Sequence, residues 1–152
     1  MSTDISEKGL ESLIVRHMTG TDGLAITPGA LTEPPAPYGG TGYFAGSPKD
    51  FDRAHALDVA QLFAFLRATQ PEAFKKLGMA DAHDAKDINR LKFLTRLSAE
   101  LGKRGAIDVL RKGIDHHPAG HFDLFYGTPS EGNAKAAALH AQNRFSVTRQ
   151  LA

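Results

Sequence analysis

The chain has 152 residues and a mass of 16.3 kDa, which suits a single domain. Its hydrophobic content of 41% is ordinary for a globular protein, and it has no cysteine, so disulfides, thiolate catalysis and cysteine-based zinc sites are excluded. The 18 basic and 17 acidic residues nearly balance, which gives no overall attraction to nucleic acid or anionic lipid. No apolar run is long enough for a membrane span and the first residues lack a signal-peptide pattern, so we expect a cytoplasmic protein without a membrane partner.

A helix is predicted over residues 6–19. The Ser6 hydroxyl can accept a hydrogen bond from an unpaired N–H of the first turn and so cap this helix. One stripe at helical spacing is formed by Leu10, Leu13, Ile14, His17 and Met18. Glu11 lies at the edge of this stripe, about 100° around the helix from Leu10.

The segment over residues 20–50 is predicted to be a long loop. It holds seven glycines and five prolines. Proline supplies no backbone N–H and glycine loses much conformational entropy when it is ordered, so regular structure is unfavourable there. The glycines match no phosphate-binding loop, because no Gly-Lys-Ser or Gly-Lys-Thr follows them.

Residues 56–113 are predicted to be a helical region. Asp58 can cap its first helix, and Thr69–Glu72 has the spacing of a capping box, with a proline where the first turn tolerates one. Asp87 can cap the longest helix, which Gly105 ends. The apolar stripe of that helix comprises Ile88, Leu91, Leu94, Leu97 and Leu101.

Residues 121–152 are predicted to form a strand, a helix and a second strand. His121–Tyr126 alternates between apolar and polar residues, Asn133 can cap an alanine-rich helix, and Arg144–Leu151 alternates again. The expected fold class is therefore α+β and mainly helical. Because the sequence stops on a strand, we expect a sheet that is incomplete at the C-terminus.

Positive charge is concentrated in the second half of the chain. Between Arg90 and Lys112 there are seven basic and two acidic residues, a local net charge of +5. Such a run is either a solvated helix face or a surface that binds phosphate groups, and the sequence leaves both open.

The residue patterns of common catalytic sites are weak or absent. His116, His117 and His121 form a cluster, but the intervening Pro118 and Gly120 exclude a helix that would aim two of them at one metal ion, so no metal site is predicted. Asp-x-Lys occurs once, at residues 84–86, in a segment with little β propensity, and Glu-x-Lys does not occur. There is also no Gly-x-Ser-x-Gly elbow.

Four stretches, in this order along the chain, resemble the N-terminal region of the R (restriction) subunit of type I restriction–modification enzymes. Thr69–Glu72 and Arg144–Gln150 are the more specific parts of the resemblance, and residues 23–38 look like an added loop. The stretches are Gly42–Asp58, Leu62–Phe74, Leu94–Gly113 and Asn143–Leu151.

The resemblance implies a fold, an activity and partners. The R subunit begins with a nuclease of the restriction-endonuclease-like PD-(D/E)xK type, an α/β fold, followed by a two-lobed ATP-dependent DNA translocase. It assembles with methyltransferase and specificity subunits on double-stranded DNA. The full complex uses Mg²⁺, ATP and S-adenosylmethionine to translocate DNA and cleave both strands in phage defence. This chain would supply the helical part and the first core strand of the nuclease.

The resemblance also implies which functional residues this chain carries. The family's catalytic Asp and Glu-x-Lys follow the segment that matches Asn143–Gln150, so we expect the isolated 152 residues to need no cofactor, to cut no DNA and to hydrolyse no ATP. Glu11 is the one catalytic candidate, as a helix glutamate near the metal. The basic second half is expected to follow duplex phosphate through Arg90, Arg96, Lys103, Arg104, Arg144 and Arg149.

Two other classes of function stay open. One is a non-enzymatic interaction module or a degenerate, truncated gene product that binds partner subunits or DNA; an exposed stripe of large apolar residues would favour it. The other is a histidine-based metal hydrolase, which metal analysis of the purified protein would test.

Overall fold

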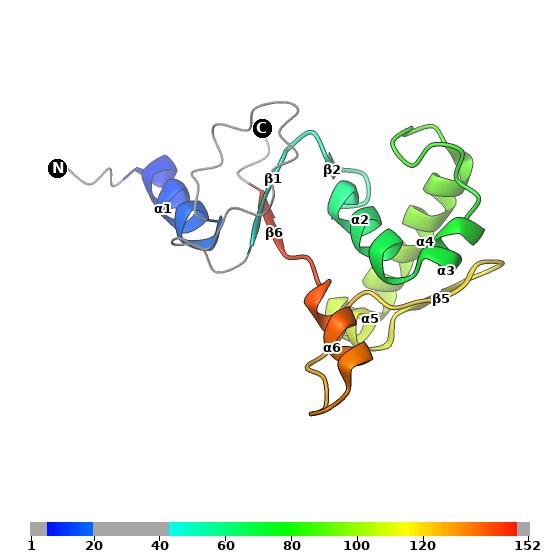
Figure 1. The fold of residues 1–152 in the computed structure, drawn as a ribbon. Helices are drawn as coiled ribbons and strands as arrows, with labels where there is room; N and C mark the ends of the chain where they lie inside the picture. The colour runs from blue at the N-terminus through cyan, green and yellow to red at the C-terminus, as the bar shows by residue number, and fades with distance from the viewer. Residues whose placement is uncertain (1–5, 20–42, 149–152) are drawn as a thin grey trace. The chain divides into compact units, whose positions relative to one another are not determined.

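The computed structural model describes residues 6–19 and 43–148, and about half of them are helical. The fold is α+β with small sheets, which confirms the predicted class. Among these residues no helix combines the length and apolarity that a bilayer crossing needs. Figure 1 shows helices α1 (Glu7–Thr19), α2 (Val59–Thr69), α3 (Pro71–Lys76), α4 (Ile88–Arg104), α5 (Ala106–Lys112) and α6 (Ala134–Ala141), and strands β1 (Phe44–Gly46), β2 (Phe51–Asp52), β3 (Leu57–Asp58), β4 (Ile114–His116), β5 (Gly120–Phe122) and β6 (Ser146–Thr148).

The chain divides into two compact units. One contains α1, β1, β2 and β6, and the other spans Arg53–Asn143. The first unit is therefore built from segments that precede and follow the second in the sequence. That the two units make up a single domain stays a prediction.

Helix α1 begins as predicted, because Ser6 Oγ accepts a hydrogen bond of 3.1 Å from the Gly9 N–H. Its buried residues are Val15 and Thr19, and the Thr19 hydroxyl donates to the Val15 carbonyl at 2.8 Å. The predicted stripe lies elsewhere on the helix. Its member Met18 is half-buried, but Leu10 at 59%, Leu13 at 51% and Ile14 at 49% are exposed.

The first unit contains a parallel pair of strands. Strand β1 pairs with β6 in the register Phe44↔Ser146, and the Phe44 N–H donates to the Phe145 carbonyl at 2.7 Å. The rings of Tyr43 and Phe145 pack with their centroids 5.8 Å apart. β6 confirms the predicted second strand over residues 146–148. Residues 20–50 were predicted to be a loop. Residues 20–42 of this range lie outside the described residues, and the prediction is wrong at β1.

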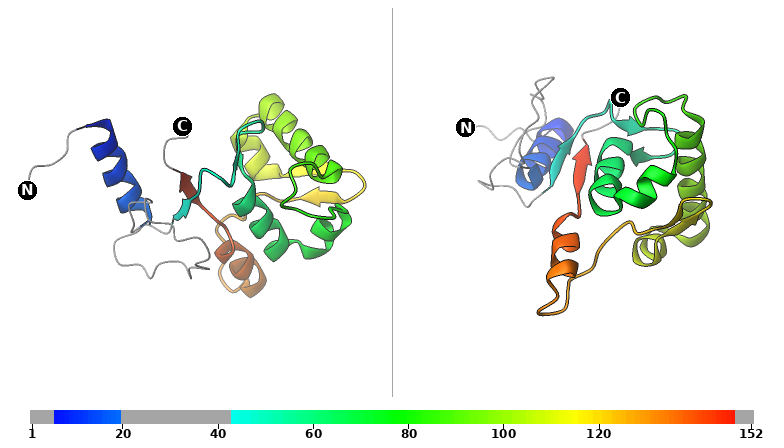
Figure 2. Two further views of the ribbon diagram at one scale, coloured as in Figure 1. Left: turned by 90° about the horizontal axis from the view of Figure 1, so that it is seen from above. Right: turned by 45° about the vertical axis from the view of Figure 1, so that its right-hand side comes forward.

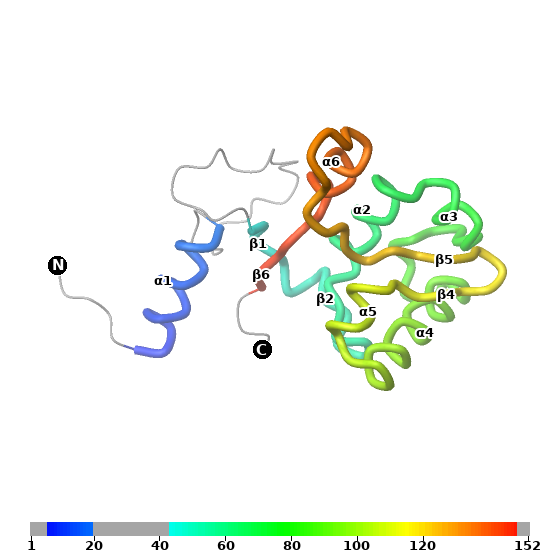
Figure 3. Tube along the Cα trace, turned by 90° about the horizontal axis from the view of Figure 1, so that it is seen from below, coloured from blue at the N-terminus to red at the C-terminus, as the bar shows by residue number. Residues whose placement is uncertain are grey.

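The second unit has one hydrophobic core. Figures 2 and 3 show the β4–β5 hairpin beside α3 and α4, which contact it. The Phe93 ring lies 5.1 Å from the Phe122 ring and 6.3 Å from the Phe63 ring, centroid to centroid. The largest fully buried side chains are Phe93, Phe122, Leu66, Leu94, Leu97, Ile114 and Val109.

Three predicted helix caps are confirmed in the second unit. Asp58 accepts a hydrogen bond from the Gln61 N–H, Asp87 from the N–H groups of residues 89 and 90, and Asn133 from the Ala136 N–H. The backbone hydrogen bonds that Asp87 accepts, of which the one from the Arg90 N–H has the largest effect, lower the pKa of Asp87.

The prediction of a capping box at Thr69–Glu72 is wrong. The N-cap of α3 is Gln70, which makes no side-chain cap, and Pro71 occupies the first turn as expected. The Thr69 hydroxyl instead donates to the Phe65 carbonyl at 2.8 Å, in the preceding helix. Thr69 is therefore the last residue of α2 and does not initiate α3.

A strand was predicted over His121–Tyr126, but the observed strand β5 ends at Phe122. Beyond it, side chains bind the backbone in place of a neighbouring strand. Gln70 Nε2 donates to the Asp123 carbonyl at 2.7 Å, and the Asp123 N–H donates to Gln70 Oε1 at 2.8 Å. Asn143 binds both backbone groups of Tyr126 in the same way, at 3.0 and 2.7 Å.

Candidate functional site

The exposed face of α4 carries a row of positive charge. Lys92, Arg96 and Lys103 lie within about 40° of one another around the helix axis, because each helical residue turns the chain by about 100°. All three are exposed, and the Arg96 side chain is 47% accessible. We call these three residues the α4 basic row. Arg96 and Lys103 were predicted as DNA-binding residues from the sequence, whereas Lys92 was not.

Arg96 is held in place by two contacts. Its Nη1 lies 3.0 Å from Glu100 Oε1, and its Nε donates to the Asp115 carbonyl in β4 at 3.1 Å. The second contact ties the helix to the hairpin and fixes the direction of the guanidinium. A fixed guanidinium loses less side-chain entropy when it binds an oxyanion.

Two other predicted DNA-binding residues are engaged within the protein. Arg90 is only 8% exposed, and its Nε donates to the Ala82 carbonyl at 3.2 Å. Arg104 binds Asp108 through Nε at 2.6 Å, and through Nη1 it binds Glu100 at 3.0 Å and the Gly113 carbonyl at 2.9 Å. The structure therefore assigns Arg90 and Arg104 to structural contacts and does not place them in the α4 basic row.

The ion pairs around Arg104 shift two pKa values. The hydrogen bond from Arg104, followed by that from Lys112, lowers the pKa of Asp108. The hydrogen bonds that Arg104 donates to Asp108 and Glu100 raise the pKa of Arg104. Glu100 is shared by Arg96 and Arg104, so one buried carboxylate orients two cations, one a turn before it and one a turn after it on α4.

The remaining predicted site residues lie in the first unit or outside the described residues. The guanidinium of Arg144, two residues before β6, lies over the ring of Phe44 at the start of β1, 4.4 Å from its centroid, which is a cation–π contact. Glu11 is half-buried on α1. Arg149 lies outside the described residues.

No cluster of three or more metal-ligating side chains occurs within residues 6–19 and 43–148. In the Asp-x-Lys segment, Asp84 Oδ1 accepts a hydrogen bond from the Lys86 N–H at 2.9 Å, a local turn contact. This segment is a loop, as its composition predicts, and it contributes no strand to a nuclease core.

The histidines of the β4–β5 hairpin have separate roles. His121 lies between two carboxylates, with Nδ1 2.7 Å from Asp115 and Nε2 3.3 Å from Asp123. The Asp115 hydrogen bond is the main reason that the pKa of His121 is raised. His116 packs edge-on against Phe93 with centroids 5.5 Å apart, and burial lowers its pKa. The peptide bond between His117 and Pro118 in the connecting turn is cis.

A pocket that the sequence did not indicate lies between α2, α3 and the loop over residues 77–87. It has a volume of about 450 Å³, and Arg67, Phe74, Met79 and His83 line it. No motif brings these residues together, because they come from two helices and a loop. The sequence offers one weak sign of the pocket: Arg67 near the end of α2 is followed seven residues later by Phe74.

No family model, no curated protein and no solved structure matches this chain.

Proposed function

We propose that this chain is the N-terminal part of a restriction subunit of the type I kind, and that its α4 basic row contacts the phosphates of double-stranded DNA. The observation that carries this proposal is the ordered series of four stretches that resemble the R subunit over nearly the whole chain. The structure of the described residues supplies two supporting observations.

The first supporting observation is the pairing of β1 with β6. These strands come from the first and last of the four stretches, and they form a parallel pair. The resemblance requires a core strand within Asn143–Leu151, and β6 is a strand at that place. Parallel sheets are normally larger than two strands and covered on both faces. In this proposal the other strands of the nuclease core, with the catalytic Asp and Glu-x-Lys, complete the sheet.

The second supporting observation is the composition and position of the α4 basic row. Lysine and arginine side chains on one face of a long helix are suited to neutralising successive phosphates. The row includes no acidic residue, because Glu100 is buried beneath it and is paired with two arginines. The proposed role is positioning of the duplex. Mg²⁺, ATP and S-adenosylmethionine would act in the full complex with the methyltransferase and specificity subunits.

The test is binding of a fluorescent DNA duplex to the purified chain at several salt concentrations. We expect binding that weakens with salt, and we expect Lys92→Gln and Lys103→Gln each to reduce the logarithmic salt slope by about 0.9. Lys135→Gln, an exposed lysine of α6, is the control and should leave the slope unchanged. Duplex binding that is absent, or that the two substitutions leave intact, would refute the role of the row.

Catalysis gives a second readout. The proposal expects no cleavage of plasmid DNA by the isolated chain with Mg²⁺ and no ATP hydrolysis. Mg²⁺-dependent cleavage that Glu11→Ala abolishes would contradict the proposal, because it would mean that the 152 residues contain a complete metal site.

A second candidate function is a non-enzymatic interaction module. The exposed apolar stripe of α1, formed by Leu10, Leu13 and Ile14, favours it, because adjacent large apolar side chains on a surface often bind partners. Sedimentation of the wild-type chain and of Leu13→Glu tests this. Self-association that Leu13→Glu abolishes supports an apolar docking role for α1, whereas a monomer in both cases speaks against self-association.

A further inference from the structure

The pocket between α2, α3 and the loop over residues 77–87 has a firmly held wall. The loop lacks regular structure, yet Asp87 Oδ2 accepts hydrogen bonds from the Ala80 and Asp81 N–H groups at 2.9 and 3.2 Å. Asn89 Nδ2 donates to the Gly78 carbonyl at 2.9 Å. Together with the bond from Arg90 to Ala82, these contacts brace the loop against the start of α4. The pocket is therefore formed before any ligand arrives.

Arg67 differs in its contacts from three other arginines of the second unit. Arg90, Arg96 and Arg104 donate hydrogen bonds to carbonyl or carboxylate oxygens. The Arg67 guanidinium instead lies over the Phe74 ring at 5.2 Å from the centroid, and it makes no ion pair within residues 6–19 and 43–148. A guanidinium stacked on a ring keeps its N–H donors free at its edge, and these can grip an oxyanion through two hydrogen bonds.

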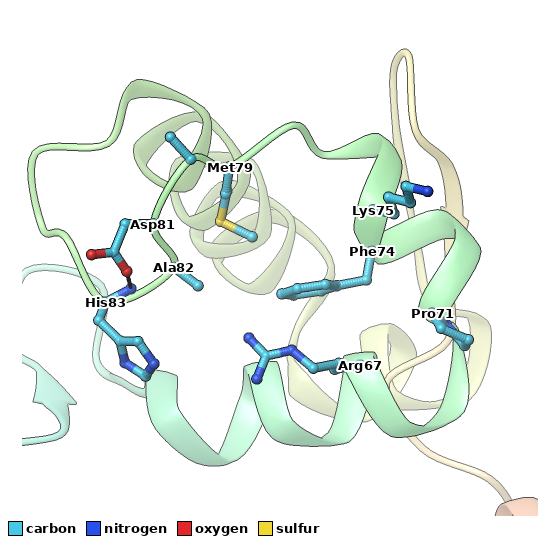
Figure 4. Close-up of a pocket in the computed structure, with 9 residues that line it drawn as sticks. Arg67, Pro71, Phe74, Lys75, Met79, Asp81, Ala82 and His83 are labelled. Carbon is cyan, nitrogen blue, oxygen red and sulfur yellow. Dashed lines mark hydrogen bonds between the residues drawn. The ribbon is translucent and has the colours of Figure 1, made fainter.

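Figure 4 shows how the pocket is arranged. The Arg67 guanidinium and the Phe74 ring point into the space between the helices and the loop, and His83 faces the guanidinium from the loop. Met79 extends toward the Phe74 ring from above. The pocket thus combines an apolar wall with donors on one side. Its volume of about 450 Å³ falls in the range of small-molecule sites.

The charges around the pocket favour an anion. The Arg67 guanidinium points into the pocket, whereas the Lys75 ammonium is directed away from it, and the one carboxylate of the lining belongs to Asp81. Asp81 Oδ1 already accepts a hydrogen bond from the His83 backbone N–H at 2.8 Å, so it is directed partly at its own loop. Arg67 is therefore the cation that can meet an oxyanion in the pocket, and its paired edge donors match the geometry of a phosphate group.

We propose that this pocket binds a small phosphate monoester, with the phosphate held by the free edge of Arg67 and a planar or apolar group packed against Phe74 and Met79. His83 supplies a further ring nitrogen on the side of the phosphate. The site is separate from the α4 basic row, and the proposal does not depend on the function proposed above.

Phenyl phosphate is the probe, added to the full 152-residue chain and followed by calorimetry and amide chemical shifts. We expect saturable binding, with the largest shifts in residues 74–83. We expect inorganic phosphate and benzoate to bind at least about tenfold more weakly, because each lacks either the ring or the second charge. Equal affinity for inorganic phosphate, or tighter binding of benzoate, would overturn the assignment.

The variants locate the site. Arg67→Gln should weaken phenyl phosphate binding about tenfold or more, and Arg67→Lys, which keeps the charge but loses the paired donors, should weaken it several-fold. Arg111→Gln, an exposed arginine of α5 outside the pocket, is the matched control and should change nothing. Thermal melts verify that each variant is folded. Binding that both Arg67 variants leave intact, or that Arg111→Gln weakens equally, contradicts the proposal.

Discussion

The side chain of Gln70 binds the backbone of Asp123 through two hydrogen bonds, of 2.7 and 2.8 Å, although the two residues are 53 positions apart. The carboxamide presents one donor and one acceptor, which is the pattern that a neighbouring strand would present. It thereby extends the pairing of the chain one residue beyond the end of β5. Gln70 also joins α2 to α3, so this contact fixes the corner between the two helices to the β4–β5 hairpin.

Replacing Gln70 by alanine should therefore lower the stability of the second unit. Both backbone groups of the half-buried Asp123 lose their partner, and we expect the free energy of unfolding to fall by about 1–3 kcal/mol. Urea denaturation followed by circular dichroism measures the change. Gln142→Ala, at an exposed position after α6, is the control, and a loss of the same size there would show that the effect is not specific to the Asp123 contact.

Three glycines form a graded test of backbone strain. Gly113 has φ +68°, and an added Cβ would collide with the Phe122 carbonyl oxygen; Gly105 has φ +83° with open space around it; Gly127 has neither constraint. Alanine at Gly105 should cost about 1–3 kcal/mol from backbone strain alone, and alanine at Gly113 should cost more. At Gly127 the effect should be small. Chemical denaturation of the three variants would contradict this interpretation if Gly105→Ala were the most damaging.

The stability of the β4–β5 hairpin should depend on the protonation of His121. Its pKa in the folded protein is raised from 6.5, first by the hydrogen bond with Asp115 and further by Asp123. A raised pKa stabilises the folded state fully below the ordinary value, and this contribution is lost as the pH rises through the folded-state value. We expect wild type to exceed His121→Gln in stability by more at about pH 5.5 than at about pH 8.5.

The cause of this shift can be tested separately by nuclear magnetic resonance. Because the Asp115 contact is the larger cause, Asp115→Asn should lower the titration midpoint of the His121 ring more than Asp123→Asn does. The opposite order would mean that Asp123 is the dominant partner. The His121 side chain is 48% exposed, so added salt should reduce both effects.

Arginine at position 104 should not be replaceable by lysine. Its guanidinium reaches Glu100, Asp108 and the Gly113 carbonyl from two different nitrogens, whereas an ammonium cannot reproduce that fork. We expect Arg104→Lys to lower the thermal midpoint and to loosen the turn between α5 and β4. Arg111→Lys, at an exposed position, serves as the control, and equal midpoints for the two variants would count against the network.

The sequence predicted the local features of the fold well. Asp58, Asp87 and Asn133 cap helices through contacts that reach only two or three residues along the chain, and such contacts are encoded by neighbouring residues. The long-range contacts of Gln70 and Asn143 could not be predicted in this way, because their partners lie elsewhere in the chain and are backbone groups without a residue-specific pattern.

The same distinction applies to the candidate site. The charge run over residues 90–112 located the α4 basic row, and Arg96 and Lys103 are exposed on it. The sequence alone could not show that Arg90 and Arg104 are engaged within the protein. Their partners include the backbone carbonyls of Ala82 and Gly113, which no residue type marks. The core was misjudged similarly. The predicted stripe of α4 includes the exposed Ile88 and omits Phe93, which fills the centre of the unit.

The sequence resemblance and the contacts of Gln70 and Asn143 concern overlapping residues. Gln70 lies within Thr69–Glu72, and Asn143 begins the stretch Asn143–Leu151. In this structure both amides hold the backbone that follows β5. The motifs therefore have a structural role in this chain that is independent of DNA cleavage, and loss of either amide should be read first as a loss of stability.

The pairing of β1 with β6 has a consequence for the order in which the protein acquires its structure. The two strands are separated by about 100 residues, so closing that loop costs entropy before any contact in the sheet offsets it. The intervening segment contains α2, α4 and α6, whose helical hydrogen bonds are short-range and close at little cost in chain entropy. We expect the segment with α2 and α4 to acquire amide protection first and β6 last, which pulse-labelled hydrogen exchange during refolding would resolve.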